Sequence, residues 1–155
     1  MPCKKRFAEE LIDISGDRMN NEQLILEAKK ARLQAYAPYS NHRVGAALLT
    51  KSGKVYHGCN IENAGYSPTV CAERTAFFKA VYDGEREFEK IAVVGGIDDA
   101  RIDNLCAPCG VCRQVMMEFC DPDTFKIVMA NGEAGCLEIL LKDLLPYGFG
   151  PSSLE

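Results

Sequence analysis

The sequence has no long run of basic residues and no long run of apolar ones. It contains 18 Lys and Arg against 22 Asp and Glu, a formal net charge of −4. Binding to DNA or RNA relies on clustered positive charge, so the composition does not favour a nucleic-acid partner. No apolar segment approaches the roughly 18 residues that a membrane helix needs, so we expect no membrane partner.

The N-terminus lacks the unbroken apolar segment of a secretory signal peptide. The basic residues at 4–6 are followed by Phe-Ala-Glu-Glu-Leu-Ile-Asp, in which acidic residues interrupt the apolar ones. Internal repeats, low-complexity segments and linkers are also missing. The 155 residues, 47% of them hydrophobic, therefore suggest one domain with a sizeable core. We expect a soluble, cytoplasmic protein.

Cysteine is plentiful, with eight residues in the chain. They are Cys3, Cys59, Cys71, Cys106, Cys109, Cys112, Cys120 and Cys136. In a secreted chain this even number would suggest disulfides. With no export signal, the clustered C-x-x-C spacing instead favours metal binding in a reducing compartment. Cysteines outside the cluster are interpreted as small buried hydrophobic residues.

Hydrophobic periodicity predicts an alternation of helices and strands. The expected helices start near residues 22, 71 and 109, with a helical turn at 142–145, and the expected strands cover 44–50, 55–59, 91–94, 125–129 and 136–140. In the first helix, which Pro38 should end, Glu27 and Arg32 are assigned to polar positions. This order predicts an α/β fold with one sheet and helices packed on its faces.

Three cysteines near two predicted helix starts suggest a metal site. Cys109 and Cys112 share a face of one first turn, and Cys71 begins another helix. The unpaired N–H groups of a helix start stabilise a thiolate. Three thiolates can bind one tetrahedral zinc ion and leave the fourth position for water, as in a catalytic zinc site. Glu73 would stand beside that water and move its proton.

Three thiolates and one Zn²⁺ leave a net charge of −1, which weakens the pull of the metal on water. Arg74 is the candidate to donate hydrogen bonds to the thiolates and offset that charge.

The spacing also permits other readings. Cys71 alone could be a core cysteine, and Glu73 a solvated helix acid. With Cys106, the cluster reads C-x-x-C-x-x-C, so a four-cysteine structural site or an iron–sulfur site stays open. The proline before Cys109 favours Cys109 as the ligand at the helix start, with Cys106 outside the set.

Several ordered motifs together resemble the small zinc-dependent cytidine deaminases of pyrimidine salvage. The resemblance covers the chain from about residue 35 to residue 154. The matching pieces read A-P-Y-S at 37–40, V-G-A-A-L at 44–48, G-C-N-I-E-N-A at 58–64, C-A-E-R-T-A at 71–76, P-C-G-V-C-R-Q at 108–114, L-L-P at 144–146 and F-G-P at 149–151. It implies a three-layer α/β/α fold with a five-stranded mixed sheet. We assign the catalytic domain to residues 20–155 and expect residues 1–19, whose pattern is less clear, to be an N-terminal extension.

The resemblance also implies roles for individual residues. Cys71, Cys109 and Cys112 would bind one Zn²⁺ ion, Glu73 would be the proton shuttle, and Arg74 would tune the thiolates. In the sugar-binding motif, Asn60 and Glu62 would hold the ribose hydroxyls, and Ala64 would offer backbone atoms to the pyrimidine. Phe149 resembles the aromatic residue that reaches a neighbouring subunit's site in tetrameric members, so a homotetramer is expected, with a dimer as the other assembly considered.

His42 is a departure from the family pattern. It stands where family members commonly carry a Phe that stacks on the substrate base. A histidine can still stack, but it is smaller, polar and titrates near neutral pH. A relative that deaminates a modified cytosine nucleoside, such as blasticidin S, is therefore an alternative.

The expected activity is the hydrolytic deamination of cytidine and deoxycytidine, in which Glu73 transfers the protons. Two alternatives belong to other classes. They are a nucleic-acid deaminase, against which the acidic balance argues, and a zinc-stabilised binding module without chemistry, against which Glu73 argues.

Overall fold

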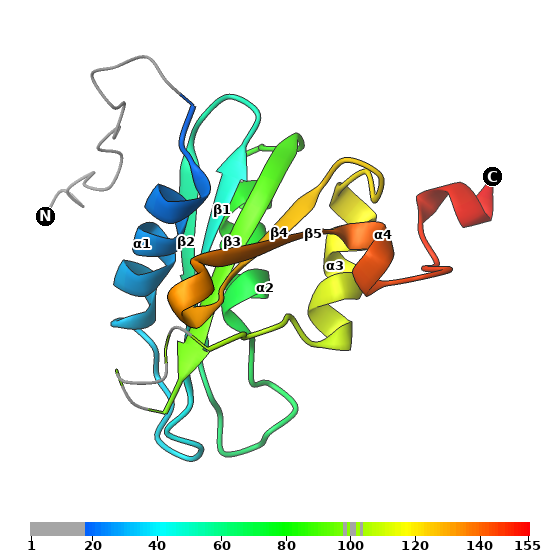
Figure 1. The fold of residues 1–155 in the computed structure, drawn as a ribbon. Helices are drawn as coiled ribbons and strands as arrows, with labels where there is room; N and C mark the ends of the chain where they lie inside the picture. Colours follow the sequence, from blue (N-terminus) through cyan, green and yellow to red (C-terminus); the bar gives the residue numbers. More distant parts are fainter. Residues whose placement is uncertain (1–17, 98, 100–101, 103) are drawn as a thin grey trace, which may run out of the picture.

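The computed structural model describes residues 18–97, 99, 102 and 104–155 (Figure 1). In chain order the main elements are α1 (Asn21–Arg32), β1 (Arg43–Thr50), β2 (Val55–Cys59), α2 (Ala72–Tyr82), β3 (Phe88–Gly96), α3 (Gly110–Phe119), β4 (Lys126–Ala130), β5 (Cys136–Leu140) and α4 (Leu141–Leu144). Two short 3₁₀ helices, η2 (Gly132–Ala134) and η3 (Pro151–Leu154), follow β4 and end the chain. Most of the predicted N-terminal extension, residues 1–17, lies outside the described residues. Of its last two residues, Met19 packs against the core beside α1.

The five strands form one mixed sheet in the order β2-β1-β3-β4-β5. Only β3 and β4 run parallel; the other neighbouring pairs are antiparallel. Helix α1 covers one face, while α2 and α3 lie on the other (Figure 1). The predicted three-layer α/β/α fold with a five-stranded mixed sheet is confirmed. Among the described residues, no helix has the length and hydropathy to span a membrane.

The central strand β3 separates the two halves of the core. Ile91 and Val93 face α2 and α3, whereas Ala92 and Val94 face α1. Successive side chains of a strand point to opposite faces, so a strand covered on both faces is apolar throughout. The sequence therefore predicted this strand correctly, although it extends beyond residues 91–94 at both ends.

Helix α1 starts where the sequence predicts and ends earlier. The Asn20 side chain accepts a hydrogen bond from Gln23 N, and the Gln23 side chain accepts one from Asn20 N, forming a capping box. The expected end at Pro38 is wrong, since the helix stops at Arg32. Tyr36 pairs its backbone with the segment after β2, donating to Asn60 O and accepting from Glu62 N. This pairing draws residues 35–37 out of the helix.

Helix α2 lies in direct backbone contact with β2 at Gly58. A Cβ atom built on Gly58 would lie 2.2 Å from Ala72 O and 2.5 Å from Ala76 N. Both atoms belong to the first turns of α2, and a side chain at residue 58 would therefore push this helix away from the sheet. The absence of that side chain sets the position of the start of α2.

Substituting Gly58→Ala should lower the free energy of unfolding by about 1–3 kcal/mol, because the added methyl overpacks a backbone contact. Urea denaturation followed by circular dichroism measures the change. Gly110→Ala is the matched control, since a Cβ there meets nothing within 4 Å. The control should be as stable as the wild type or slightly more so. Equal stability of the Gly58→Ala protein would show that α2 and β2 separate without cost.

Candidate metal centre

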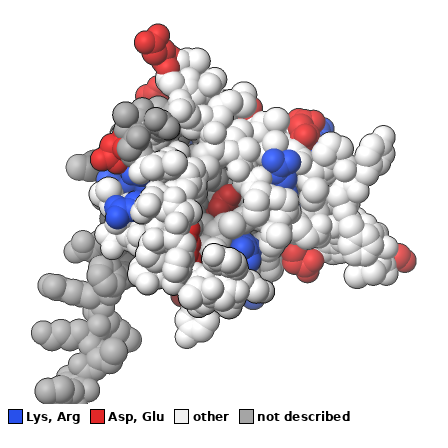
Figure 2. All heavy atoms as spheres, turned by 90° about the horizontal axis from the view of Figure 1, so that it is seen from below, with Lys and Arg blue, Asp and Glu red and all other residues white. Residues whose placement is uncertain are grey.

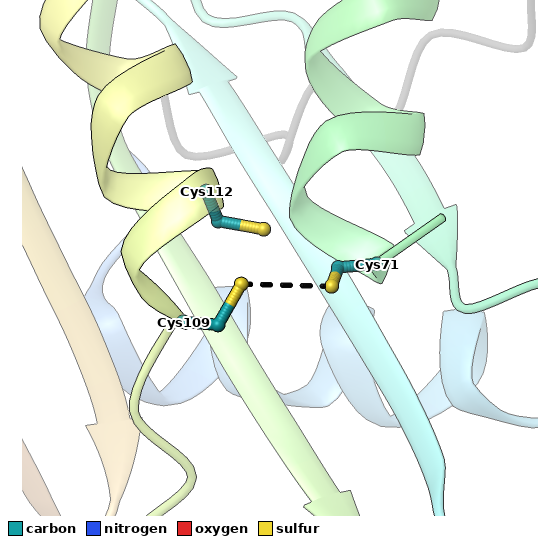
Figure 3. Close-up of side chains that lie close together, drawn as sticks. All are labelled: Cys71, Cys109 and Cys112. Atoms are coloured by element: carbon teal, nitrogen blue, oxygen red, sulfur yellow. Dashed lines mark hydrogen bonds between the residues drawn. The ribbon is translucent and has the colours of Figure 1, made fainter. Parts of the chain in front are cut away.

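Cys71, Cys109 and Cys112 converge between two helix starts. Cys71 is the N-cap residue of α2 and Cys109 that of α3, and neither side chain makes a capping hydrogen bond. Their thiols are therefore free to face the space between the helices. Cys112 lies in the first turn of α3 and is buried. In Figure 3 all three sulfur atoms point toward one another.

The spacing of the sulfur atoms suits one tetrahedral metal ion. The Sγ atoms of Cys71 and Cys109 are 3.8 Å apart, and all three lie within 4.8 Å of one another. Zn–S bonds of about 2.3 Å at tetrahedral angles place two sulfur ligands roughly 3.8 Å apart. The donor set therefore fits a zinc ion held by three thiolates.

Cys106 is not part of this group of three. It packs against the core between the sheet and α2 and α3, as does Cys120, while Cys136 packs on the α1 side. All seven cysteines in the described part of the chain are free. The arrangement therefore favours the three-ligand reading over a four-cysteine structural site.

The three thiols cannot all be deprotonated unless a positive charge compensates the thiolates. Hydrogen bonds from Cys112 and then Arg74 lower the pKa of Cys71 to about 5, against the opposing effect of burial. The hydrogen bond to Cys71 and burial in turn raise the pKa of Cys112 far above its ordinary value. A divalent cation resolves this conflict, because a thiol that coordinates a metal is deprotonated.

Arg74 supplies positive charge on the protein side of the cluster. One guanidinium nitrogen is 3.6 Å from Cys71 Sγ and 3.4 Å from Thr69 O. The Nε atom is buried and has no hydrogen-bond partner within the described structure. The guanidinium therefore offsets thiolate charge and links the cluster to the loop before α2.

Glu73 is a buried carboxyl group next to the sulfur atoms. Its residue is 4% exposed, although it lies in the first turn of α2. Burial raises the pKa of Glu73 to about 7, and the negative charge of Cys71 adds to the rise. A carboxyl group in this environment can both accept and release a proton near neutral pH.

Asn60 holds the chain at the start of β1. Its Nδ2 donates to His42 O and its Oδ1 accepts from Val44 N, each at 2.8 Å. Its own backbone N donates to Val44 O at 3.2 Å. Asn60 is thus largely buried and structurally engaged, which the sequence alone did not indicate.

Glu62 lies beside His42, and Ser40 joins them. The Glu62 carboxylate accepts hydrogen bonds from the Ser40 hydroxyl and from the backbone N of Tyr39 and Ser40. The Ser40 hydroxyl in turn accepts from His42 N at 3.0 Å. The Ser40 hydrogen bond in particular lowers the pKa of Glu62, which is therefore an anion at neutral pH.

The loop carrying these residues is closed next to Cys71. Ile61 and Val70 exchange backbone hydrogen bonds, each at 3.0 Å. The hydroxyl of Thr75 lies 3.0 Å from Cys59 O and 3.2 Å from Cys71 O, so it can donate to either. The sequence motif did not predict a role for Thr75, because its contacts depend on α2 lying against β2. Through Thr75, the structure therefore brings Cys59, the residue before Asn60, next to the candidate metal ligand Cys71.

Ala64 and Phe149 lie further out. Ala64 is exposed in the loop between β2 and α2. Phe149 lies in the C-terminal tail, where its carbonyl oxygen accepts a hydrogen bond from Gln114 on α3 and its residue is 58% exposed. Figure 1 shows this tail extending beyond α4, away from the sheet. The ring of Phe149 is thus available to another molecule.

Figure 2 views the molecule from the end where β3 finishes and the loops before β1 and before α2 project. Acidic atoms lie recessed near the middle of this face, surrounded by uncharged ones. The basic groups in this view are separated, and over the described residues they form no continuous band. This face therefore suits a small ligand better than an extended polyanion.

Comparison with known proteins identifies relatives of this chain. The model of the family described as the cytidine and deoxycytidylate deaminase zinc-binding region matches residues 18–129. A cytidine deaminase of Sporosarcina psychrophila is 51% identical over 88% of this chain and 96% of the relative. A crystal structure of a cytidine deaminase from Burkholderia pseudomallei, 50% identical, covers 84% of this chain and 100% of that chain with a TM-score of 0.76.

A blasticidin-S deaminase from Bacillus cereus is a more distant relative. It is 32% identical over 71% of this chain and 79% of the relative.

Substituting Cys71→Ser, Cys109→Ser or Cys112→Ser should reduce bound zinc from one ion per chain to well below one, because each removes a thiolate ligand. Zinc is measured by inductively coupled plasma mass spectrometry on gel-filtered protein. Cys106→Ser is the matched control and should keep one zinc per chain. Loss of zinc from the control would instead support a four-cysteine site.

Proposed function

We propose that this chain, which belongs to the cytidine and deoxycytidylate deaminase zinc-binding family, converts cytidine and deoxycytidine to uridine and deoxyuridine with release of ammonia. The observation that carries the proposal is the buried Glu73 carboxyl group beside three converging thiols. Water activation and proton transfer are the two requirements of hydrolytic deamination, and this arrangement supplies residues for both. Blasticidin S deamination is less well supported, since that relative is the more distant one.

Zinc, when held by Cys71, Cys109 and Cys112, supplies the Lewis acid that makes water a nucleophile near neutral pH. Glu73 accepts a proton from the attacking water and delivers it to the ring nitrogen next to the amino-bearing carbon. With the water oxygen now bonded to that carbon, Glu73 carries the remaining proton of this hydroxyl to the amino group. The C–N bond then breaks, the carbon becomes a carbonyl, and the amino group leaves as ammonia. Burial suits Glu73 to this work, because a pKa near 7 favours transfer in both directions.

Asn60 and Glu62 are the proposed sugar-binding residues. The amide of Asn60 retains hydrogen-bonding capacity beyond its bonds to His42 and Val44, since Nδ2 carries a second hydrogen and Oδ1 a second lone pair. Glu62 is an anion fixed by backbone N–H groups, which suits it to accept from a sugar hydroxyl. Ala64, in the same loop, would present backbone atoms to the pyrimidine.

His42 and Phe149 are the proposed aromatic contacts of the base. His42 lies beside the Asn60 amide, where its ring can stack on a pyrimidine. The exposed Phe149 would reach the site of a neighbouring subunit in a homotetramer.

We place this activity in pyrimidine salvage in the cytoplasm. The free thiols of the described chain support a reducing compartment. The scattered basic groups support a nucleoside substrate rather than a nucleic acid.

Substituting Glu73→Gln should reduce kcat for cytidine by roughly 10²–10⁴-fold or more, because the amide keeps the shape but cannot shuttle protons. Loss of the cytosine absorbance is followed in the ultraviolet with cytidine, deoxycytidine and blasticidin S in parallel. Zinc content should not change. Glu118→Gln, an exposed acid on α3, is the control and should retain full activity. An active Glu73→Gln enzyme would remove Glu73 from the mechanism.

Substituting His42→Phe should lower KM for cytidine by roughly threefold, because a larger apolar ring stacks better on the base. His42→Ala should raise KM, and kcat should be similar in all three proteins. Steady-state kinetics with cytidine measure both constants. If KM is the same in the Phe, His and Ala proteins, residue 42 does not contact the base.

A further inference from the structure

Arg32 is a buried cation that joins three segments of the chain. It ends α1 and is 3% exposed, although the sequence pattern assigned it to a polar position. Its Nε donates to Arg43 O at 3.1 Å, and one terminal nitrogen donates to Gly96 O at 2.9 Å. The other terminal nitrogen binds Asp99 at 2.8 Å. The guanidinium therefore ties α1 to the start of β1 and the end of β3.

The two backbone acceptors are paired with each other in the sheet. Arg43 lies opposite Gly96, and Val44 opposite Gly95, at the last positions of the β1–β3 ladder. Arg32 therefore fixes the two strands to each other at the end of the ladder that adjoins the proposed substrate-binding loops.

At this end, the side chains of Asn60 and Arg32 bind the backbone of His42 and of the two residues after it. Asn60 binds His42 O and Val44 N, while Arg32 binds the carbonyl of the residue between them. A Cβ built on Gly95 would lie 3.3 Å from His42 Nε2, so the imidazole lies against the end of β3. A shift of either strand end would consequently move the ring of His42.

Stability alone does not require an arginine here. A buried ion pair is often no more stabilising than apolar residues of the same volume. The only carboxylate bound to Arg32 in the described structure, that of Asp99, has a side chain 88% exposed. An exposed partner adds little stability. What a planar guanidinium uniquely provides is several donors in fixed directions, which specify geometry.

The rest of α1 makes this geometry rigid. A Cβ at Gly45 would lie 2.1 Å from Ala28 O and 2.3 Å from Arg32 N, so the last turn of α1 rests on the backbone of β1. The base of the Arg32 side chain is thus held against the strand whose first carbonyl its guanidinium binds.

We propose that Arg32 is a positioning residue for the pyrimidine site, acting by fixing residues 42–44 and hence the ring of His42. The proposal rests on the proposed function, in which His42 contacts the base. It assigns to Arg32 an effect on substrate binding and none on proton transfer, because its bonds lead to the His42 segment and not to Glu73 or the sulfur atoms.

Arg32→Met and the milder Arg32→Lys test the proposal. Lysine keeps the charge but cannot bridge three acceptors in one plane. Both variants should raise KM for cytidine, roughly tenfold for Arg32→Met, with kcat within about twofold of the wild type. Both should keep one zinc per chain. Hydrogen exchange measured by mass spectrometry should quicken in the peptide that contains residues 42–47.

Lys90→Met is the matched control. Lys90 is 8% exposed and binds Asn21 at 2.9 Å, so it joins β3 to the other end of α1. Lys90→Met removes a comparable buried cation at the far end of α1 and should leave KM and exchange at residues 42–47 unchanged, whatever its effect on stability. Asp99→Asn should also leave KM unchanged, because both backbone bonds of Arg32 remain.

Two results would overturn the role of Arg32. One is an unchanged KM in Arg32→Lys, and the other is an equal rise of KM in Lys90→Met, which would reflect general loss of stability. Failure of the proposed function looks different, because the zinc-loaded wild type would then not deaminate cytidine at all.

Discussion

The contact of α2 with β2 at Gly58 is the constraint on which the active centre depends. It brings the backbone of the first turns of α2 onto the sheet. Cys71 and Glu73 stand at that helix start, so their positions follow from this contact. Helix α3 is held to the same layer through the aromatic packing of Phe77 with Phe119 and Phe125. The metal ligands thus come from two helices that a common core orients.

The centre combines charges that a protein interior ordinarily separates. Three thiols and a carboxyl group lie together, and each negative charge makes the next one harder to form. Arg74 and the two helix starts supply part of the compensation, and a divalent cation would supply the rest. Burial, with the negative charge of Cys71 as a smaller contribution, raises the pKa of Glu73 to about 7, where a proton shuttle is most useful.

The proposed nucleoside-binding end of the site is built differently, from segments whose backbone groups are bound by side chains. Asn60 and Arg32 both bind backbone groups around His42, and Glu62 accepts hydrogen bonds from the backbone of the preceding turn. None of these segments belongs to a helix. The bound backbone groups lie at the first residues of β1, at the end of β3 and in the turn before β1, and the side chains that bind them also define where the proposed ligand-binding atoms lie.

The sequence by itself determined the element order, the helix starts at Cys71 and Cys109 and the composition of the metal centre, because these depend on local periodicity and short spacing. The family motifs extended this to the three-layer fold. Only the tertiary structure decided that Glu27 and Arg32 are buried and that α1 ends at Arg32. Glu27 binds Lys30 in its own helix, but its other partner, His57, and the Gly96 carbonyl that Arg32 binds are distant in the chain. A local pattern reports the polarity of a side chain but not the distant groups that will satisfy it, so these features arise only when the strands assemble.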